Sequence, residues 1–219
     1  DISPEELHFE ITHSCNSRCI MCDIWNQYHH DSQLKKEELA FEEIKGLIDK
    51  SNYFKKLKLV LLSGGEPFLR EDIAEVCGYF IQKFPSISLG ILTNCFDTKL
   101  TLDKIEEIID RYAPYSLWIG SSLDGLNEKH DRIRGVKGAF SALVKTLDLI
   151  KEKFPKLKIS LNFTLTTKNY GQLLPSFRFA KDRGFDFSAQ FAVPWMGVEK
   201  FIWDKTQLQE VRRQVEIIM

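Results

Sequence analysis

Residues 58–67 have the sequence KLVLLSGGEP, in which a continuous apolar run ends at two adjacent glycines. A run without polar alternation is typical of a strand buried on both faces, as in a parallel sheet covered by helices. The glycines allow the backbone to come close to a ligand. The stretch therefore predicts a buried strand whose C-terminal end faces a binding site.

The same pattern recurs on both sides of this run. Strand-like stretches occupy residues 7–12, 88–93, 116–121, 158–165 and 186–193. Amphipathic stretches predict helices at residues 36–50, 71–84, 102–112, 139–154, 172–183 and 206–219, and Gly or Pro marks several of their ends. Strict alternation of strand and helix indicates right-handed crossovers and a parallel sheet, so the predicted fold class is α/β.

Six strand–helix units are fewer than the eight of a closed TIM barrel. Two architectures fit this number: a doubly wound open sheet, and a curved, TIM-like partial (β/α)6 barrel of parallel strands. In both, the strand-to-helix loops gather at the C-terminal ends of the strands, so the active site is expected there.

The composition limits the classes of partner. The 219 residues carry 30 Lys and Arg against 31 Asp and Glu, a net charge of -1, which indicates no nucleic-acid or membrane-surface partner. No apolar run is long enough to span a bilayer, and no signal peptide opens the chain. Five cysteines, an odd number, do not match a secreted disulfide scaffold. Reduced thiols and a cytoplasmic location are therefore expected.

Three of the cysteines form a compact motif. Cys15, Cys19 and Cys22 have the spacing C-x3-C-x2-C and follow the first predicted strand directly. Three thiolates on one tight loop can converge on one face of an iron–sulfur cubane and leave its fourth iron open to another ligand. The alternatives are inert buried thiols or a zinc ion. Zinc would need a fourth ligand, for which the candidates are His13, His29 and His30.

The stretch 11–22, ITHSCNSRCIMC, resembles the cluster loop of the radical S-adenosylmethionine (SAM) superfamily. This resemblance implies that Cys15, Cys19 and Cys22 hold a [4Fe–4S] cluster whose open iron chelates the amino and carboxylate groups of SAM. It further implies that an electron from the reduced cluster cleaves SAM to a 5′-deoxyadenosyl radical, which takes hydrogen from a substrate. Further motifs in the family's order extend the resemblance over nearly the whole chain.

Two of these motifs end the second and third predicted strands. Gly64, Gly65 and Glu66, followed by proline, resemble the family motif that binds the amino group of SAM. Thr93 and Asn94 match the start of a Thr-Asn-Gly element that is expected to face SAM. Cys95 replaces its glycine. It either faces the site or fills space in the loop, and the second is the expectation. Cys77, on an apolar helix face, is expected in the core.

The fourth strand leads into Ser-Leu-Asp-Gly at 122–125 and His-Asp-x-x-Arg-Gly at 130–135. By the resemblance, Ser122 contacts the ribose or methionine end of SAM and Arg134 pairs with its carboxylate. A guanidinium suits that group. Asp124 is either a further polar group at this rim or the cap of the following turn. His130 is expected to stabilise the loop.

The remaining SAM contacts are expected on the last strands and beside the cluster. Asn162, on the fifth strand, is the candidate for the ribose, and Thr164 shares its face. The sixth strand, from Gln190 to Val193, is expected to border the adenine. Near the cysteines, the candidates for the adenine are Met21, Ile24 and Trp25.

Together these elements look most like the branch that carries C-terminal SPASM or twitch domains, which includes peptide maturases and small-molecule dehydrogenases. No cysteine follows Cys95, so these residues provide no ligands for an auxiliary cluster. Residues 1–200 are expected to form the radical SAM core. Residues 201–219 form a trailing helix that would begin a further C-terminal region.

The expected function is modification of an unknown substrate, a peptide or a small molecule, by a radical SAM enzyme. A reductant such as flavodoxin or ferredoxin would supply the electron. The alternatives are a radical SAM methyltransferase, a small-molecule dehydrogenase and, more remotely, a non-catalytic zinc-binding module. The sequence identifies no catalytic acid or base.

Overall fold

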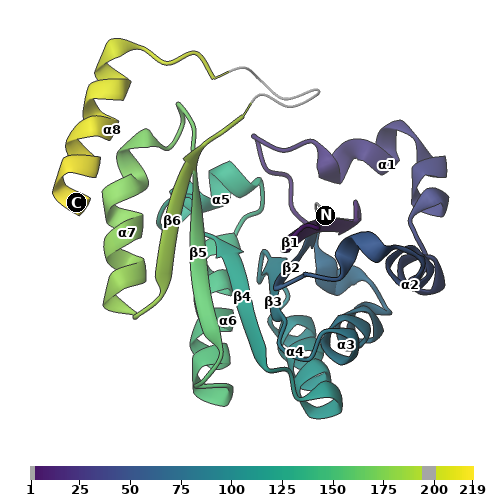
Figure 1. The fold of residues 1–219 in the computed structure, drawn as a ribbon. Helices are drawn as coiled ribbons and strands as arrows, with labels where there is room; N and C mark the ends of the chain where they lie inside the picture. The colour runs from purple at the N-terminus through teal and green to yellow at the C-terminus, as the bar shows by residue number, and fades with distance from the viewer. Residues whose placement is uncertain (1–2, 194–200) are drawn as a thin grey trace.

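A computed structural model describes residues 3–193 and 201–219, and within them one parallel sheet holds six strands in chain order (Figure 1). The strands are β1 (Glu6–Thr12), β2 (Leu59–Gly64), β3 (Ser88–Thr93), β4 (Ser116–Ser122), β5 (Lys158–Leu165) and β6 (Asp186–Phe191). Each strand pairs in parallel with the next, and in this described part of the chain β1 and β6 do not pair with each other. The predicted parallel α/β sheet is confirmed, and it is not closed.

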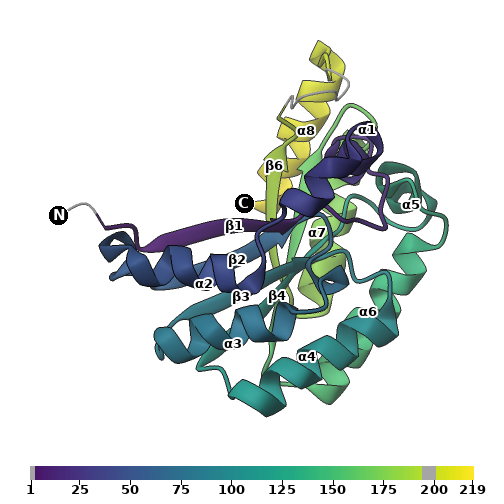
Figure 2. The same cartoon turned by 90° about the vertical axis from the view of Figure 1, so that its right-hand side faces the viewer.

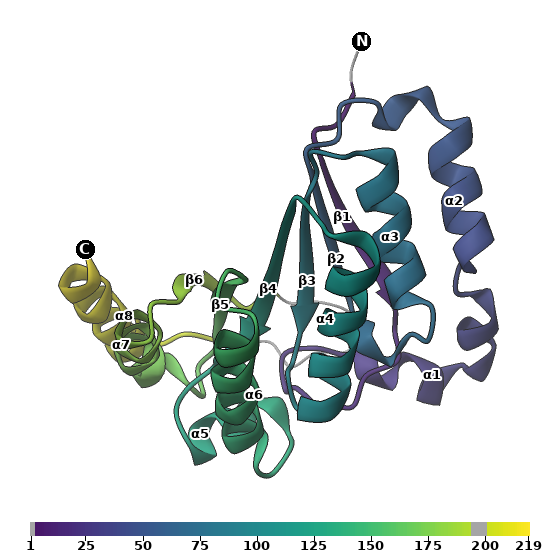
Figure 3. The ribbon, with the colours of Figure 1, turned by 90° about the horizontal axis from the view of Figure 1, so that it is seen from below.

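The main helices lie along the outer side of the curved sheet (Figures 2 and 3). They are α2 (Phe41–Lys50), α3 (Ile73–Lys83), α4 (Thr98–Tyr112), α6 (Ala139–Lys153) and α7 (Leu173–Asp182). A doubly wound sheet would carry helices on both faces. The structure is therefore the partial barrel, and its inner face is left for a ligand.

Shorter elements lie in the connecting segments, and all but the turn at 52–54, which precedes β2, follow the C-terminal end of a strand. They are the helices α1 (Gln27–His30) and α5 (Glu128–Arg134), and the 3-10 turns η1 (Ile24–Asn26), η2 (Ser32–Glu37), η3 (Asn52–Phe54), η4 (Pro67–Leu69) and η5 (Tyr170–Gln172). Neither α1 nor α5 was predicted, because each is too short to show a helical period in the sequence.

The predicted helix at 36–50 is wrong in its first turn. The chain leaves η2 at Glu37 and enters α2 only at Phe41. Between them, Glu38 accepts hydrogen bonds from Thr12 Oγ1 and the His13 amide, both at 2.7 Å. This tertiary contact holds the backbone extended, and α2 then starts with the Glu43 side chain capping the Ala40 amide.

The main core lies between the sheet and its outer helices. Side chains on one face of the central strands, such as Val60, Ile91 and Leu161, are completely buried there. Cys77 belongs to this core with no exposed surface, as expected. On the inner face, Trp118 covers Gly90, where an added Cβ would meet the indole at 2.3 Å.

The last helix, α8 (Lys205–Ile218), packs beside α7 (Figure 3). Val211 joins Phe163 and Leu173 in a second, smaller apolar cluster. Gln214 is buried, and its side chain bonds both the Leu174 amide and the Tyr170 carbonyl. None of the helices in residues 3–193 and 201–219 combines the length and apolarity needed to cross a bilayer.

Candidate functional site: a cysteine-lined cavity at the open barrel

A cavity of about 590 Å³ opens at the C-terminal ends of the strands and continues along the inner face of the sheet. Its volume is that of a site for a small molecule or cofactor. All the site residues predicted from the sequence line it, except Glu66 and Asp124. Those lining residues are Cys15, Cys19, Met21, Cys22, Ile24, Trp25, Gly64, Gly65, Thr93, Asn94, Ser122, Arg134, Asn162, Gln190 and Val193.

The cysteine loop is fixed on one side by the turn after β2. The Gly65 amide donates to the Thr12 carbonyl and the Glu66 amide to the Ser14 carbonyl, both at 2.7 Å. A Cβ on Gly65 would lie 2.2 Å from the Ser14 oxygen, closer than two such atoms can approach. Glycine is therefore required here by the approach of two loops.

The end of α5 holds the other side of the same loop. The Arg18 amide donates to the Arg134 carbonyl at 2.9 Å, and the Ile20 amide to the Ile133 carbonyl at 3.0 Å. Gly135 ends α5 with φ +66°, and a Cβ there would lie 2.2 Å from the Arg18 oxygen. The His-Asp-x-x-Arg-Gly element thus shapes the cysteine loop in addition to placing the Arg134 side chain.

Ser17 lies against two of the thiols. The Ser17 amide donates to Cys15 Sγ at 3.4 Å, and Ser17 Oγ lies 2.9 Å from Cys19 Sγ. Burial raises the pKa of Cys15 to about 11 and also raises that of Cys22. The thiols of Cys15 and Cys22 therefore keep their protons at neutral pH until a metal displaces them.

This donor set fits an iron–sulfur cluster. Fe–S irons take thiolate sulfur, and N–H donors beside the sulfurs stabilise such centres. Within the described residues, no three His, Cys, Asp or Glu side chains gather closely enough to hold one metal ion. A cubane instead carries its three cysteines on three different irons, which requires a wider spacing than the ligands of a single ion.

Glu66 lies just behind the cavity wall and is almost fully buried. Its carboxylate accepts hydrogen bonds from the Asn94 amide at 2.7 Å and the Phe68 amide at 3.2 Å. Burial raises the pKa of this carboxyl to about 7, against the lowering effect of these donors. A cationic or hydrogen-bond-donating group bound in front of it would restore its charge.

Asn94 connects Glu66 to the cysteine loop. Its side chain donates to Asn16 Oδ1 at 2.6 Å, while its own Oδ1 accepts from the Phe96 amide. Cys95, the next residue, is fully buried and has φ +59°. Glycine adopts this left-handed conformation most easily, which agrees with the glycine expected at this position of the Thr-Asn-Gly element. The expectation that Cys95 fills space in the loop agrees with its burial.

Arg134 reaches the cavity with its guanidinium while Asp124 supports it from behind. Arg134 Nη1 donates to Asp124 Oδ2 at 3.2 Å, and Asp124 Oδ1 accepts from the Thr164 amide at 2.7 Å. Asp124 is fully buried and outside the cavity lining, so its contact is with Arg134. Arg134 Nε is buried and has no partner in the part of the chain described. An unpaired donor of this kind suits an anionic group such as a carboxylate.

His130 lies beside Asp124 and has a structural role. It is fully buried, its Nδ1 accepts from the Asp124 amide at 3.2 Å, and Phe96 and Phe140 lie against its ring. Burial lowers its pKa to about 3. It is therefore a neutral imidazole that stabilises the loop, in agreement with its expected role.

The lower cavity wall contains residues that the sequence analysis did not select. On β5 and β6 these are Ser160 and Ser188, and elsewhere on the inner face they are His8, Leu61 and Trp118. Ser188 Oγ donates to Asn162 Oδ1 at 2.6 Å. Strand alternation could have identified them, because Ser160 and Ser188 share a face with residues that were chosen.

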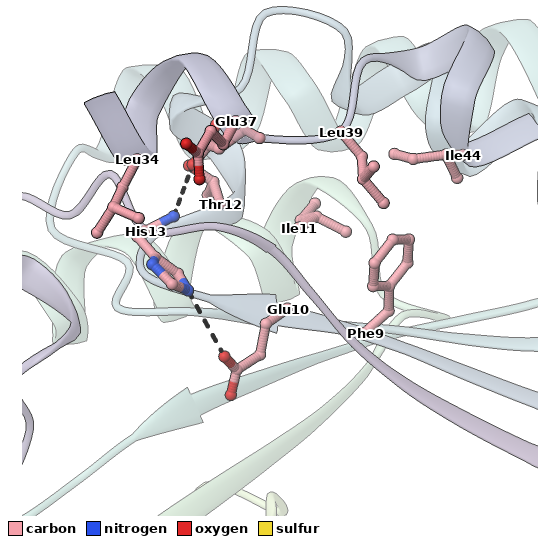
Figure 4. Close-up of a pocket in the computed structure, with 10 residues that line it drawn as sticks. Phe9, Glu10, Ile11, Thr12, His13, Leu34, Glu37, Leu39 and Ile44 are labelled. Carbon is pink, nitrogen blue, oxygen red and sulfur yellow. Dashed lines mark hydrogen bonds and ion pairs between the residues drawn. The ribbon is translucent and has the colours of Figure 1, made fainter. Parts of the chain in front are cut away.

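A smaller cavity of about 270 Å³ lies on the other face of β1, against η2 and α2 (Figure 4). Beside it, Glu38 receives the Thr12 and His13 bonds described above and a further one from the Tyr28 hydroxyl. Among the described residues that line it, only His13 was named in the sequence analysis, as a candidate fourth ligand of zinc. Its apolar wall consists of Phe9, Ile11, Leu34, Leu39 and Ile44.

Comparison with known proteins shows the family of this chain. The model of the radical SAM superfamily matches residues 9–180. The Fe-coproporphyrin III synthase of Methanosarcina barkeri is 28% identical over 213 residues, which cover 96% of this chain and 50% of that protein. The subtilosin biosynthesis protein AlbA of Bacillus subtilis is 30% identical over 152 residues, covering 68% and 31%.

A solved structure shares the fold over nearly the full chain. SuiB of Streptococcus suis bound to S-adenosylmethionine superposes with a TM-score of 0.75 at 19% identity, covering 99% of this chain and 47% of SuiB. Its complex with the precursor peptide SuiA gives a TM-score of 0.74 at 21% identity, covering 99% and 46%. The chain thus spans about half the length of these proteins or less. Because the family match extends over most of the described residues, this chain belongs to the radical SAM superfamily, whose cofactors are a [4Fe–4S] cluster and SAM.

Proposed function

We propose that this chain is the catalytic core of a radical SAM enzyme. The observation that carries the proposal is the convergence of Cys15, Cys19 and Cys22 on one cavity with Arg134, whose Nε has no partner among the described residues. When bound, the cluster and SAM supply an electron and a 5′-deoxyadenosyl radical that takes hydrogen from the substrate. The protein's own residues bind, orient and shield these groups.

The roles of the residues follow from their positions. Cys15, Cys19 and Cys22 would hold the cluster. Arg134, supported by Asp124, would pair with the carboxylate of SAM. The Gly64–Glu66 turn and the Thr93–Asn94 strand end would contact its amino group.

The ribose and adenine contacts are proposed on the rest of the cavity wall. Ser122 and Asn162 would contact the ribose. The adenine would lie between the β6 end and the cluster side, where its neighbours would be Gln190, Val193, Met21, Ile24 and Trp25.

We further propose that residues 1–200 form the radical SAM core and that 201–219 begin a further region. The substrate is a peptide: AlbA takes part in subtilosin biosynthesis, and SuiB has been seen with a precursor peptide. A flavodoxin or ferredoxin in the cytoplasm would deliver the electron, which also suits reduced thiols.

The test is an anaerobic reaction of the cluster-loaded protein with SAM and a strong reductant. We expect 5′-deoxyadenosine and methionine, formed slowly without substrate and faster with it. Cys19→Ala should form neither, while Cys77→Ala, a cysteine in the core, should retain both. A loaded protein that forms no 5′-deoxyadenosine under any condition contradicts the proposal. SAM labelled in its methyl group distinguishes a methyltransferase from the other radical SAM reactions, because only methyl transfer would carry the label into the product.

A further inference from the structure

One carboxylate oxygen joins the two ends of the segment that carries the cysteines. Oε1 of Glu38 accepts hydrogen bonds from Thr12 Oγ1 and the His13 amide, both at 2.7 Å, and a further one from the Tyr28 hydroxyl. Thr12 and His13 come just before the cysteine loop, whereas Glu38 comes after it, beyond η2. Hydrogen bonds to a carboxylate are stronger than those to a neutral acceptor. Residues 14–37 are therefore closed into a loop at a single atom.

Thr12 extends this contact to the cysteine loop. Its side chain is buried, and its Oγ1 accepts a hydrogen bond from the Ser14 amide at 3.0 Å. Because an amide can only donate and a carboxylate only accept, the Thr12 hydroxyl proton points to Glu38. The Thr12 carbonyl accepts from the Gly65 amide, as described above. Thr12 thus joins Glu38, the turn after β2 and the residue before Cys15.

The first half of the chain between Cys22 and Glu38 is not part of the apolar core. Within η1, α1 and η2, all of which the structure describes, no side chain is buried. Nevertheless Ile24 and Trp25 of η1 line the cavity beside the cysteines. Tyr28, in the adjoining α1, is linked through Glu38 to the end of β1. Polar contacts therefore determine the position of this side of the cavity.

A separate contact holds the neighbouring backbone. Arg70 Nη1 donates to the Ile11 carbonyl at 2.7 Å and to the Leu39 carbonyl at 3.1 Å. The Arg70 side chain is 9% exposed and pairs with Asp72 at 2.7 Å. The approach to α2 therefore stays attached to β1 when the Glu38 carboxylate is removed. Variants of Glu38 are accordingly expected to fold.

We propose that Glu38 is a positioning residue for SAM, which holds the η1 side of the cavity in place relative to the cysteine loop. This inference rests on the proposed radical SAM function and adds to it a residue outside the described lining of the cysteine cavity. Cluster binding does not depend on Glu38, because the turn after β2 and the end of α5 still support the cysteines. SAM binding does depend on it, because the adenine is proposed to lie against Met21, Ile24 and Trp25.

The experiment compares SAM binding by cluster-loaded wild type, Glu38→Ala and Glu38→Gln. The readouts are the dissociation constant from calorimetric titration, the iron content, and the EPR spectrum of the dithionite-reduced cluster as SAM is added. In Glu38→Ala we expect the dissociation constant to rise about tenfold at unchanged iron content. The spectral change that SAM causes should then require correspondingly more SAM.

Two further variants serve as rescue and control. Glu38→Gln keeps an acceptor oxygen for the same donors, so its dissociation constant should stay within about threefold of wild type. Glu37→Ala removes the exposed carboxylate next to Glu38 and should leave the dissociation constant as it is.

Thr12→Val tests the same contact from its other partner. Valine has nearly the shape of threonine but no hydroxyl, so the bonds to Glu38 and Ser14 are lost. We expect the dissociation constant for SAM to rise about threefold. Combined with Glu38→Ala, it should stay within about twofold of Glu38→Ala alone, because residues of one hydrogen-bond network are not additive.

The outcomes separate this inference from the proposed function. A wild-type chain that binds no cluster or no SAM contradicts the radical SAM function, and this inference with it. Where wild type binds both, an unchanged dissociation constant in Glu38→Ala overturns the positioning role, even if urea unfolding shows a lower stability. Loss of iron in Glu38→Ala, or an equal rise of the dissociation constant in Glu37→Ala, overturns it as well. If Glu38→Ala does not fold, an unchanged dissociation constant in Thr12→Val has the same consequence.

Discussion

Two parts of the same cavity differ in how they are built. The rim, at the C-terminal ends of the strands, holds the cysteines and Arg134, and the wall is the polar inner face of β5 and β6. Behind the rim, the carboxyl groups of Glu66 and Asp124 have 3% and 0% of their surface exposed, and each accepts more than one hydrogen bond. Along β6, by contrast, every residue but Phe187 is exposed. There Ser188 makes a single side-chain bond, to Asn162.

The difference shows which part of the site is free to change. A buried charge without its partners is very costly, so the rim residues are fixed jointly and hold one cofactor geometry. The wall residues Ser188 and Gln190 on β6 are neutral and exposed, and exchanging them costs the fold little. One scaffold can therefore keep its cofactor while its substrate changes. The predictions below test this contrast, beginning with the rim.

The largest effect is expected from Cys19→Ala. Cys19 is 7% exposed and one of only three thiols in the cavity lining described here, so its loss leaves one iron of a cubane without a ligand. Iron content and the brown absorbance after anaerobic reconstitution should fall to background. Cys77→Ala is the matched control and should keep its iron. Full iron content in Cys19→Ala would remove this cysteine from the site.

Gly135→Ala should be nearly as damaging, although it changes no ligand. The added methyl group would meet the Arg18 carbonyl at 2.2 Å, and alanine is strained at φ +66°. We expect several kcal/mol of destabilisation, on the order of 3 kcal/mol, and poor cluster loading.

Gly138→Ala provides a close control for this variant. It also has a positive φ, +81°, but an added Cβ has nothing within 4 Å. The free energy of unfolding should then fall only by the backbone strain, about 1 kcal/mol. Thermal unfolding and iron content would measure both variants. Equal effects would show that contact with the cysteine loop is unimportant.

SAM affinity tests the two ends of the rim. Glu66→Gln should weaken the hold on the amino group, and Arg134→Ala the hold on the carboxylate, each by about 2–4 kcal/mol. Calorimetric titration of the cluster-loaded variants measures this, with Arg212→Ala on the exposed face of α8 as control. Unchanged affinity in both rim variants would mean that other residues bind the methionine part of SAM.

The pH dependence of the free energy of unfolding tests the raised pKa of the buried Glu66. Its pKa is about 7 in the folded protein against an ordinary 4.5, so the folded state holds an extra proton between these values. Its contribution to stability is therefore present below pH 4.5 and is lost as the pH rises to about 7, by on the order of 2–3 kcal/mol.

The comparison of variants isolates this contribution. The pKa of His130 is lowered to about 3, so His130 adds the opposite slope, and Asp124, whose pKa burial raises, adds to the slope of Glu66. Urea unfolding of the metal-free chain from pH 5 to 7.5 should show that wild type loses more stability than Glu66→Gln as the pH rises. If stability changed with pH equally in wild type and Glu66→Gln, the pKa of Glu66 would not be raised in the folded protein.

The smallest effect is expected on the wall. Ser188→Ala removes the 2.6 Å hydrogen bond to Asn162 at an exposed position. The free energy of unfolding should fall by no more than about 1 kcal/mol, and the iron content should not change. Chemical denaturation and iron analysis measure both quantities. A fall in the free energy of unfolding as large as that in Gly135→Ala would show that the wall is as important for stability as the rim.

The same contrast explains what could be predicted from the sequence. Strands such as β3 and β5 were located to the residue because the apolar run of β3 and the alternating apolar residues of β5 leave a local signal. The cysteines and Gly64–Glu66 were found because their spacing along the chain carries their chemistry. The placing of Asp124 behind Arg134 and the helix break at Glu38 depend on partners in distant segments, which no local pattern contains. Ser160 and Ser188 were missed because a small polar side chain carries no chemical motif, and only strand alternation places them on the same face as Asn162 and Gln190.

The bonds between the cysteine loop and α5 also set an order of assembly. Ser17 Oγ donates to the Arg134 carbonyl across 117 residues of sequence. During synthesis, at roughly 5–20 residues per second, the cysteines leave the ribosome several seconds before the segment that shapes them. Until then the three thiols are on an unsupported loop. Delivery of iron and sulfide is therefore productive only after four strand–helix units have folded, so maturation of this centre is a late, post-folding event.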